Sequence, residues 1–346
     1  MQVPPPLRVV VADDSAFMRR LLSEALSKSG FEVVAAVEDG DQALRASTSL
    51  HPDVLTLDLA MPGLDGLGVL RELRATGSPV PVVVVSAFSP AHGARAVDAL
   101  AEGAVDLVAK PAAGEDLRAF LAELAEKVRL AASSSQRREP APAAAAVRAR
   151  PRIARPGRRR RPRPVVIACS TGGPKALAEL VPKLPSPLGA GALLVQHMPA
   201  GFTGSLAARL DRASPLTVRE AATGDSLDPG TILVAPGGKH LRLRDDRTAA
   251  LTDDPSIGGL RPRADLTIVD AAKMFGSDLL LVVLTGMGKD GLEGAHEVRR
   301  RGGTILVEDE STCTIYGMPR AIVEAGLADG VHPLTRLPDA IAAEVA

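Results

Sequence analysis

Short apolar runs alternate with helical stretches twice along this chain, on either side of an arginine-rich segment. In residues 7–130 the apolar runs are LRVVVADD, FEVVAAV, DVLTLDL, VPVVVVSA and AVDLVAK, with helices expected at 15–28, 41–49, 66–75, 91–102 and 114–130. Strands that are apolar along their whole length are typical of a parallel sheet covered on both faces. The first half of the chain is therefore predicted to contain five βα units.

The second half repeats the alternation. Buried strands are expected at 165–169, 191–195, 279–284 and 303–307, with helices between them. The stretch DPGTILVAPGGKHLRLR, residues 228–244, has strand, turn and strand character around PGG, which predicts a hairpin. We expect a doubly wound, mostly parallel α/β domain with an antiparallel hairpin at the sheet edge.

Charge separates the two halves. The net charge is zero over 346 residues, but residues 131–163 hold 11 arginines against Glu139 alone. This Ser/Ala/Pro/Arg-rich segment lacks apolar periodicity and is interpreted as a linker. The predicted domains are therefore 1–130 and 164–346. The linker arginines could bind a polyanion, but a solvated linker is favoured because no base-reading element accompanies them.

Several classes of protein are disfavoured. The chain has no Trp, one Tyr and six Phe, too few aromatic side chains for stacking on single-stranded nucleic acid. Two cysteines, Cys169 and Cys313, form neither a metal-ligand spacing nor a disulfide framework. Neither a signal peptide nor a membrane-spanning apolar run is visible. We expect a cytoplasmic protein without membrane insertion.

Polar residues gather where the strands of the first half end. Asp13 and Asp14 end the first strand, Asp58 the third, Ser86 the fourth and Lys110 the fifth. Ligands of such sheets bind at the carboxyl ends of the strands. Carboxylates there could hold Mg²⁺, and Asp58 could accept a phosphoryl group whose oxygens contact the hydroxyl and the ammonium. A single acid is more often a helix cap, but five such residues are harder to explain as caps.

The stretches VVVADDS, LDLAMPGLDGL, VVVVSA and AVDLVAKP resemble the receiver domain of bacterial response regulators. The resemblance implies a flavodoxin-like fold and phosphorylation of Asp58 by a histidine kinase. It also implies Mg²⁺ bound by Asp13, Asp14 and Asp58. One position departs from the family: Leu107 stands where receivers carry the Tyr or Phe whose rotamer reports phosphorylation.

Strand ends also collect reactive residues in the second half. Ser170, His197 and Asp290 each follow an apolar run of the predicted sheet. Together they could form a serine hydrolase site, with His197 as base and Asp290 orienting the imidazole. The glycines of TGMGKDG could bring backbone N–H groups to an oxyanion, or to a phosphate. No phosphate-loop spacing is matched, and the interpretation depends on the three loops together.

The stretches ACSTGGPKAL, VQHMPAGFT, APGGKH, LTGMGKDG and YGMPRA resemble the chemotaxis protein-glutamate methylesterases, the CheB family. The resemblance assigns Ser170 as nucleophile, His197 as base and Asp290 as orienting acid. It places the oxyanion contact near the Met287 backbone, with Thr171 close by. The residues before the serine, Ala168-Cys169, replace the family's usual Gly-Ala.

The implied function is a phosphorylation-activated hydrolase. It would demethylate glutamate methyl esters on chemoreceptor helices and deamidate glutamines there, without a cofactor for the esterase. Without phosphate, the receiver is expected to cover the active site. Two alternatives remain: a DNA-binding response regulator that uses the basic linker, and a non-catalytic scaffold on an esterase fold.

Overall fold

The computed structural model describes residues 5–87, 90–111, 116–135 and 162–345. The chain divides into two compact units, Met1–Pro140 and Ala141–Ala346, and each is described by itself. Neither unit contains, among the described residues, a helix that is long and apolar enough to cross a membrane.

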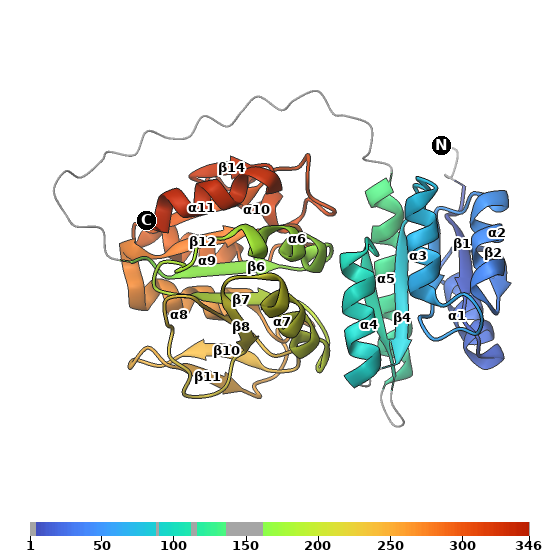
Figure 1. The fold of residues 1–346 in the computed structure, drawn as a ribbon, viewed down its shortest axis with the longest axis horizontal. Helices are drawn as coiled ribbons and strands as arrows, with labels where there is room; N and C mark the ends of the chain where they lie inside the picture. Colours follow the sequence, from blue (N-terminus) through green and yellow to red (C-terminus); the bar gives the residue numbers. More distant parts are fainter. Residues whose placement is uncertain (1–4, 88–89, 112–115, 136–161, 346) are drawn as a thin grey trace. The chain divides into compact units, whose positions relative to one another are not determined.

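The N-terminal unit is a five-stranded parallel sheet in the order β2-β1-β3-β4-β5 (Figure 1). Strands and helices alternate along the chain as the sequence predicts. The strands are β1 (Arg8–Ala12), β2 (Glu32–Val37), β3 (Val54–Leu57), β4 (Val82–Ala87) and β5 (Asp106–Lys110). The helices are α1 (Ala16–Lys28), α2 (Gly40–Leu50), α3 (Gly66–Ala75), α4 (Pro90–Ala101) and α5 (Leu117–Ser135).

This sheet brings the ends of distant segments together. β1 lies between β2 and β3, and every residue of β3 is buried. Leu22 and Leu26 of α1 pack with Phe120 and Leu124 of α5 in one apolar cluster with the strands. Because all five strands are parallel, the residues that follow β1 and β3 meet at one edge. The predicted flavodoxin-like architecture is confirmed.

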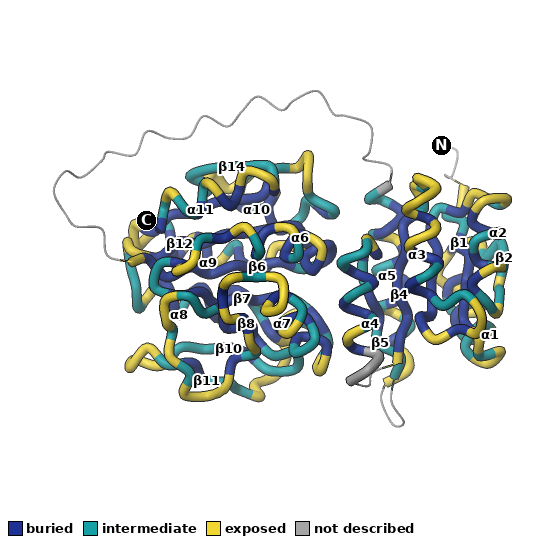
Figure 2. The backbone as a smooth tube through the Cα atoms, in the orientation of Figure 1, coloured by how far each residue is buried: buried dark blue, intermediate teal, exposed yellow. Residues whose placement is uncertain are grey.

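The C-terminal unit is built on a seven-stranded sheet in the order β14-β13-β12-β6-β7-β9-β8, all parallel. Its strands are β6 (Val165–Cys169), β7 (Ala192–Gln196), β8 (Thr217–Glu220), β9 (Thr231–Val234), β12 (Leu280–Val283), β13 (Thr304–Glu308) and β14 (Gly330–His332). The central strands are buried at every position, which matches their uninterrupted apolar sequences (Figure 2).

The helices of this unit are α6 (Gly173–Leu180), α7 (Phe202–Ala213), α8 (Ala264–Phe275), α9 (Leu292–Arg300), α10 (Met318–Glu324) and α11 (Leu337–Val345). Buried side chains of α8, α9 and α10 join one face of the sheet in a single apolar core, while α6 packs against α7. The chain leaves β6 toward β7 and leaves β12 toward β13, in opposite directions across the sheet. β6 and β12 therefore flank a topological switch point, where doubly wound folds bind ligands.

The hairpin forms, but with a different pair of strands from those predicted. The run TILV is β9, which lies between β7 and β8 in the parallel sheet. β10 (His240–Leu243) instead pairs antiparallel with β11 (Ala249–Thr252), as a separate two-stranded sheet and not as an edge of the large one. The expected pairing across PGG is wrong: the apolar residues of TILV, Ile232 to Val234, are all buried, as in a strand that is covered on both faces.

The segment between the units is folded at both of its ends. α5 continues to Ser135, beyond the end expected at residue 130, and residues 136–161 of the predicted linker lie outside the described residues. Arg163, counted with the linker arginines, is buried against the C-terminal sheet. Its guanidinium donates to the carbonyl oxygens of Asp278 (3.0 Å) and Leu279 (2.9 Å). This arginine therefore satisfies buried backbone groups.

Candidate active site

The ends of β6 and β7 place Ser170 and His197 on neighbouring strands. Cys169 and Gln196 are partners in the parallel register, so the next residue on each strand is Ser170 and His197. The His197 N–H donates to the Cys169 carbonyl oxygen at 3.1 Å, and the Ser170 N–H donates to the Thr285 carbonyl oxygen at 3.0 Å. Ser170 thus lies between the loop after β7 and the loop after β12.

His197 and Asp290 form a buried pair. His197 Nε2 lies 2.7 Å from Asp290 Oδ2, and their side chains are 8% and 2% exposed. Since a carboxylate only accepts hydrogen bonds, the neutral imidazole carries its proton on Nε2 and leaves Nδ1 as the basic nitrogen. The Ser170 hydroxyl has no hydrogen-bond partner within the described part of the chain. Serine–histidine contacts are often long in free enzymes and tighten with substrate.

Asp290 is held as a carboxylate by two sets of donors. Burial opposes its charge, but the hydrogen bond and charge of His197, with backbone N–H groups, lower the pKa of Asp290 below its ordinary value. The N–H of Ala264 donates to Oδ2 at 2.7 Å, and the N–H of Asp265 donates to Oδ1 at 2.9 Å. Both N–H groups belong to the first turn of α8, where the helix dipole also favours a negative charge.

Asp265 completes a reciprocal arrangement between two helix ends. Its Oδ1 accepts from the N–H of Gly291 and the N–H of Gly294, both at 2.9 Å, at the start of α9. Neither α8 nor α9 has a side-chain cap of its own. Asp290, which precedes α9, therefore caps the start of α8, and Asp265, in the first turn of α8, caps the start of α9. Arg263 lies between the two acids: Nη2 donates to Asp265 Oδ2 at 2.8 Å, and Nε lies 3.5 Å from Asp290 Oδ1.

This role of Asp265 is not predicted by the sequence. An acid in the first turn of a helix is ordinary, and only the fold reveals that it caps a different helix. Burial raises the pKa of Asp265, and the nearby charge of Asp290 acts in the same direction. The guanidinium of Arg263 and the backbone N–H donors oppose that rise.

The loop after β12 presents a backbone donor beside the serine. The Met287 side chain is 38% exposed, and its N–H has no hydrogen-bond partner among the described residues. Gly286, just before it, is fixed because its carbonyl oxygen accepts from the N–H groups of Gly317 (3.0 Å) and Met318 (2.8 Å). A Cβ on Gly286 would lie 2.8 Å from the Ser170 Cβ, so only glycine permits this approach.

Thr171 is buried next to the serine. Its carbonyl oxygen accepts from Thr285 Oγ1 at 2.9 Å, which ties the serine loop to the loop after β12. Thr285 is held in turn by Glu308, whose buried carboxylate accepts the Thr285 N–H at 2.8 Å. Thr171 therefore lies near the predicted site, as part of its framework.

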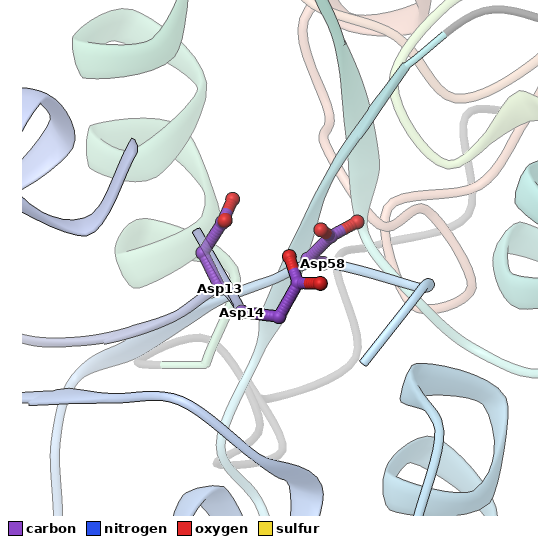
Figure 3. Close-up of side chains that lie close together, drawn as sticks. All are labelled: Asp13, Asp14 and Asp58. Carbon is purple, nitrogen blue, oxygen red and sulfur yellow. The ribbon is translucent and has the colours of Figure 1, made fainter. Parts of the chain in front are cut away.

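The N-terminal unit holds a separate acidic site. Asp13, Asp14 and Asp58 each offer a carboxylate oxygen, and these oxygens lie within 4.8 Å of one another. Figure 3 shows Asp13 and Asp14 in the loop after β1 and Asp58 in the loop after β3. Asp13 and Asp58 are buried, whereas Asp14 is exposed. Lys110 Nζ lies 2.7 Å from Oδ2 of both Asp13 and Asp58.

This acidic site has the chemistry of a hard-cation site. Asp13 Oδ2 is buried and has no partner with hydrogen-bond geometry, although Lys110 lies close. Burial raises the pKa of Asp13. Burial also disfavours the charged form of Lys110, but its contacts with the carboxylates of Asp13 and Asp58 outweigh this and raise the pKa of Lys110. Ser86 is buried near the end of β4, and its hydroxyl donates to the Ala87 carbonyl oxygen at 3.3 Å. Three carboxylates gathered at one edge of the sheet, two of them buried, fit Mg²⁺.

Leu107 has the position expected of a buried strand residue. It belongs to β5 and is 1% exposed, and its carbonyl oxygen accepts from Lys127 Nζ of α5 at 2.6 Å. No aromatic side chain stands there, as the sequence indicated.

Known proteins resemble both units. Residues 165–341 match the family model described as CheB methylesterase, and residues 9–122 match the response regulator receiver domain. A protein-glutamate methylesterase/protein-glutamine glutaminase of Symbiobacterium thermophilum is 45% identical, over 97% of this chain and 96% of that protein. One of Myxococcus xanthus, with the same name and the number 5, is also 45% identical, over 96% and 97%.

A solved structure supports the same relationship. The catalytic domain of the CheB methylesterase of Thermotoga maritima is 43% identical and covers 52% of this chain and 97% of that domain, with a TM-score of 0.51. The resemblance inferred from the sequence motifs is thereby confirmed. With a receiver domain at its N-terminus and these relatives over nearly its whole length, the chain belongs to the CheB methylesterase family.

Proposed function

We propose that this chain is a phosphorylation-activated protein-glutamate methylesterase that uses Ser170, His197 and Asp290. Its substrates are methyl esters of glutamate side chains on chemoreceptors, and it also deamidates glutamines there, as the names of its relatives indicate. The observation that carries the proposal is the buried His197–Asp290 pair, one strand away from Ser170 in the parallel register.

In the acylation step, Ser170 Oγ attacks the ester carbonyl carbon while His197 Nδ1 accepts the hydroxyl proton. Asp290 stabilises the imidazolium, and its hydrogen bond to Nε2 supports this direction of proton transfer. The N–H of Met287, which has no partner in the described part of the chain, is a donor for the oxyanion. Collapse of the tetrahedral intermediate breaks the ester bond, and His197 protonates the departing methoxide to give methanol.

In the deacylation step, water attacks the acyl group on Ser170 with His197 again as base. The second collapse returns the proton to Ser170 Oγ and releases the glutamate carboxylate. A glutamine side chain follows the same path with ammonia as the leaving group. The esterase chemistry needs no cofactor in this scheme.

Regulation is assigned to the receiver. Asp58 accepts the phosphoryl group from a chemotaxis histidine kinase, and Lys110 and Ser86 contact its oxygens. Asp13, Asp14 and Asp58 would hold Mg²⁺, and the ion would supply positive charge to offset that of the phosphoryl oxygens. The receiver restrains the esterase until Asp58 is phosphorylated, a population shift between two states. A cytoplasmic location is part of the same proposal, and so are two domains joined by the arginine-rich linker, with α5 reaching Ser135 and Arg163 packing on the C-terminal sheet.

Replacing the nucleophile tests the esterase. Ser170→Ala should reduce methanol release from methylated receptor by at least about 10³-fold, because no other group forms the acyl intermediate. Ser277→Ala is the matched control, since Ser277 is exposed before β12, at the opposite edge of the sheet. Methanol release at the wild-type rate from Ser170→Ala would remove the assignment.

Replacing Asp290 tests whether this acid sets the tautomer of the His197 imidazole. The amide introduced by Asp290→Asn can donate to His197 Nε2, which moves the imidazole proton to Nδ1 and removes the base. We expect kcat for methanol release to fall about 10⁴-fold. Asp278→Asn, at an exposed acid before β12, is the control that should keep kcat. A loss below tenfold would contradict the proposed role of Asp290.

The lowered pKa of Asp290 also predicts how stability depends on pH. A carboxyl with a lowered folded-state pKa stabilises the fold above its unfolded value, 3.8, and loses that contribution as the pH falls toward the folded value. At pH 7 the wild type should therefore have a larger free energy of unfolding than Asp290→Asn. The difference between the two free energies should become smaller below about pH 4. Fluorescence of the single tyrosine, Tyr316, follows unfolding of this unit in urea. A difference independent of pH would exclude the charge as its source.

Replacing the phosphoryl acceptor tests regulation. A small-molecule phosphodonor should raise methanol release by the wild type about 10-fold, within the usual range of coupling energies. Asp58→Asn should abolish this rise, and so should removal of Mg²⁺ with a chelator. Asp41→Asn, at an exposed acid of α2, is the control that should still respond. An undiminished response in Asp58→Asn would place phosphorylation elsewhere.

A further inference from the structure

Gln196 lies between the loop of the proposed nucleophile and the loop of the proposed base. It is the last residue of β7, and it is 2% exposed. Its Nε2 donates to the Ser170 carbonyl oxygen at 3.0 Å and to the His197 carbonyl oxygen at 2.9 Å. Both protons of the amide are therefore used, one on each loop.

The other end of this amide is fixed by Cys169. The Cys169 Sγ lies 3.0 Å from Gln196 Oε1, and Cys169 is completely buried. Burial raises the pKa of the Cys169 thiol, so the sulfur keeps its proton and can donate it. The reverse orientation of the amide would set Oε1 against two carbonyl oxygens. The contacts therefore agree on a single orientation.

The backbone at the start of α6 passes close to this amide and to the Cys169 sulfur. A Cβ on Gly173, the first residue of α6, would lie 2.0 Å from Gln196 Oε1 and 3.0 Å from Cys169 Sγ. The Gly173 N–H also donates to the Ser170 carbonyl oxygen at 2.8 Å. The carbonyl of the proposed nucleophile is thus held by two donors, from α6 and from β7.

We propose that Gln196 is a positioning residue for the reaction, and that Cys169 orients it. Its amide couples the serine and histidine loops, so that Ser170 and His197 keep a fixed separation. The inference rests on the proposed function, and it gives Cys169, which stands where the family usually has Ala, a role. Because a displacement of about 1 Å can reduce a rate about 10²-fold, the amide matters to kcat without touching substrate.

Methanol-release kinetics of the full chain test the proposal. Gln196→Met keeps the length of the side chain and removes both donors. Its kcat should fall about 10- to 10²-fold, while KM stays within about threefold, because substrate contacts are unchanged. Gln42→Met replaces a half-buried glutamine in the N-terminal unit and should keep kcat. A kcat within twofold of wild type for folded Gln196→Met would overturn the proposal.

The cysteine supplies a second test that does not depend on Gln196→Met folding. Cys169→Ser keeps a donor toward Oε1 and should retain most of kcat, whereas Cys169→Ala should lose several-fold with KM unchanged. A residue that merely fills space would make the two variants alike, and equal kcat values would contradict the proposal.

The wild type and Ser170→Ala are measured in the same series. If the wild type releases no methanol, the proposed function itself fails. If the wild type is active, Ser170→Ala is inactive and the Gln196 and Cys169 variants match the wild type, only the positioning role fails.

Discussion

The parallel pairing of β6 with both β7 and β12 is the constraint on which the esterase unit depends. It aligns Cys169 with Gln196 and Ala168 with Val283, so the loops after three strands start from one edge. The chain turns in opposite directions after β6 and β12, and in doubly wound folds such a switch point leaves a crevice for a ligand between the two loops. The apolar sequences of these strands make the register firm, because each strand is buried at every position.

A buried charge at this edge needs compensation, and two helices supply it. An unsatisfied buried N–H costs about 1–3 kcal/mol, and an unpaired buried carboxylate costs more. Asp290 accepts from the N–H groups of Ala264 and Asp265 at the start of α8, and Asp265 accepts from those of Gly291 and Gly294 at the start of α9. In return, these N–H groups hold both carboxylates in place. The arrangement explains how Asp290 stays ionised beside His197. Because Asp290 is held by the start of α8 and in turn holds His197, the packing of this helix also sets the orientation of the imidazole.

The sequence predicted the architecture well because its dominant signal is local. Uninterrupted apolar runs identified the central strands of both sheets, and polar residues just after them identified both edges. Ser170 and His197 could be placed together because adjacent parallel strands end at the same edge. Motifs such as STGG and GMGKDG then indicated the family, and the comparisons confirm it.

What the sequence could not predict depends on contacts between distant segments. The turn-like PGG predicts a hairpin that includes TILV, but this strand pairs in parallel with β7 and its last three residues are buried. Asp265 and Gln196 were missed because the contacts that define their roles, to Gly291 for Asp265 and to Ser170 for Gln196, each span 26 residues of the chain. Arg163 resembled its linker neighbours in sequence, and only its contacts with the sheet separate it from them.

The central claim is that Ser170 is a nucleophile activated by His197, and one measurement addresses it most directly. A fluorophosphonate probe is incubated with the full chain, and the modified residue is located by peptide mapping with mass spectrometry. The account predicts a single adduct on Ser170, whose rate of formation falls at least about 10²-fold in His197→Ala. An adduct on another residue, or a rate that His197→Ala leaves unchanged, would contradict it.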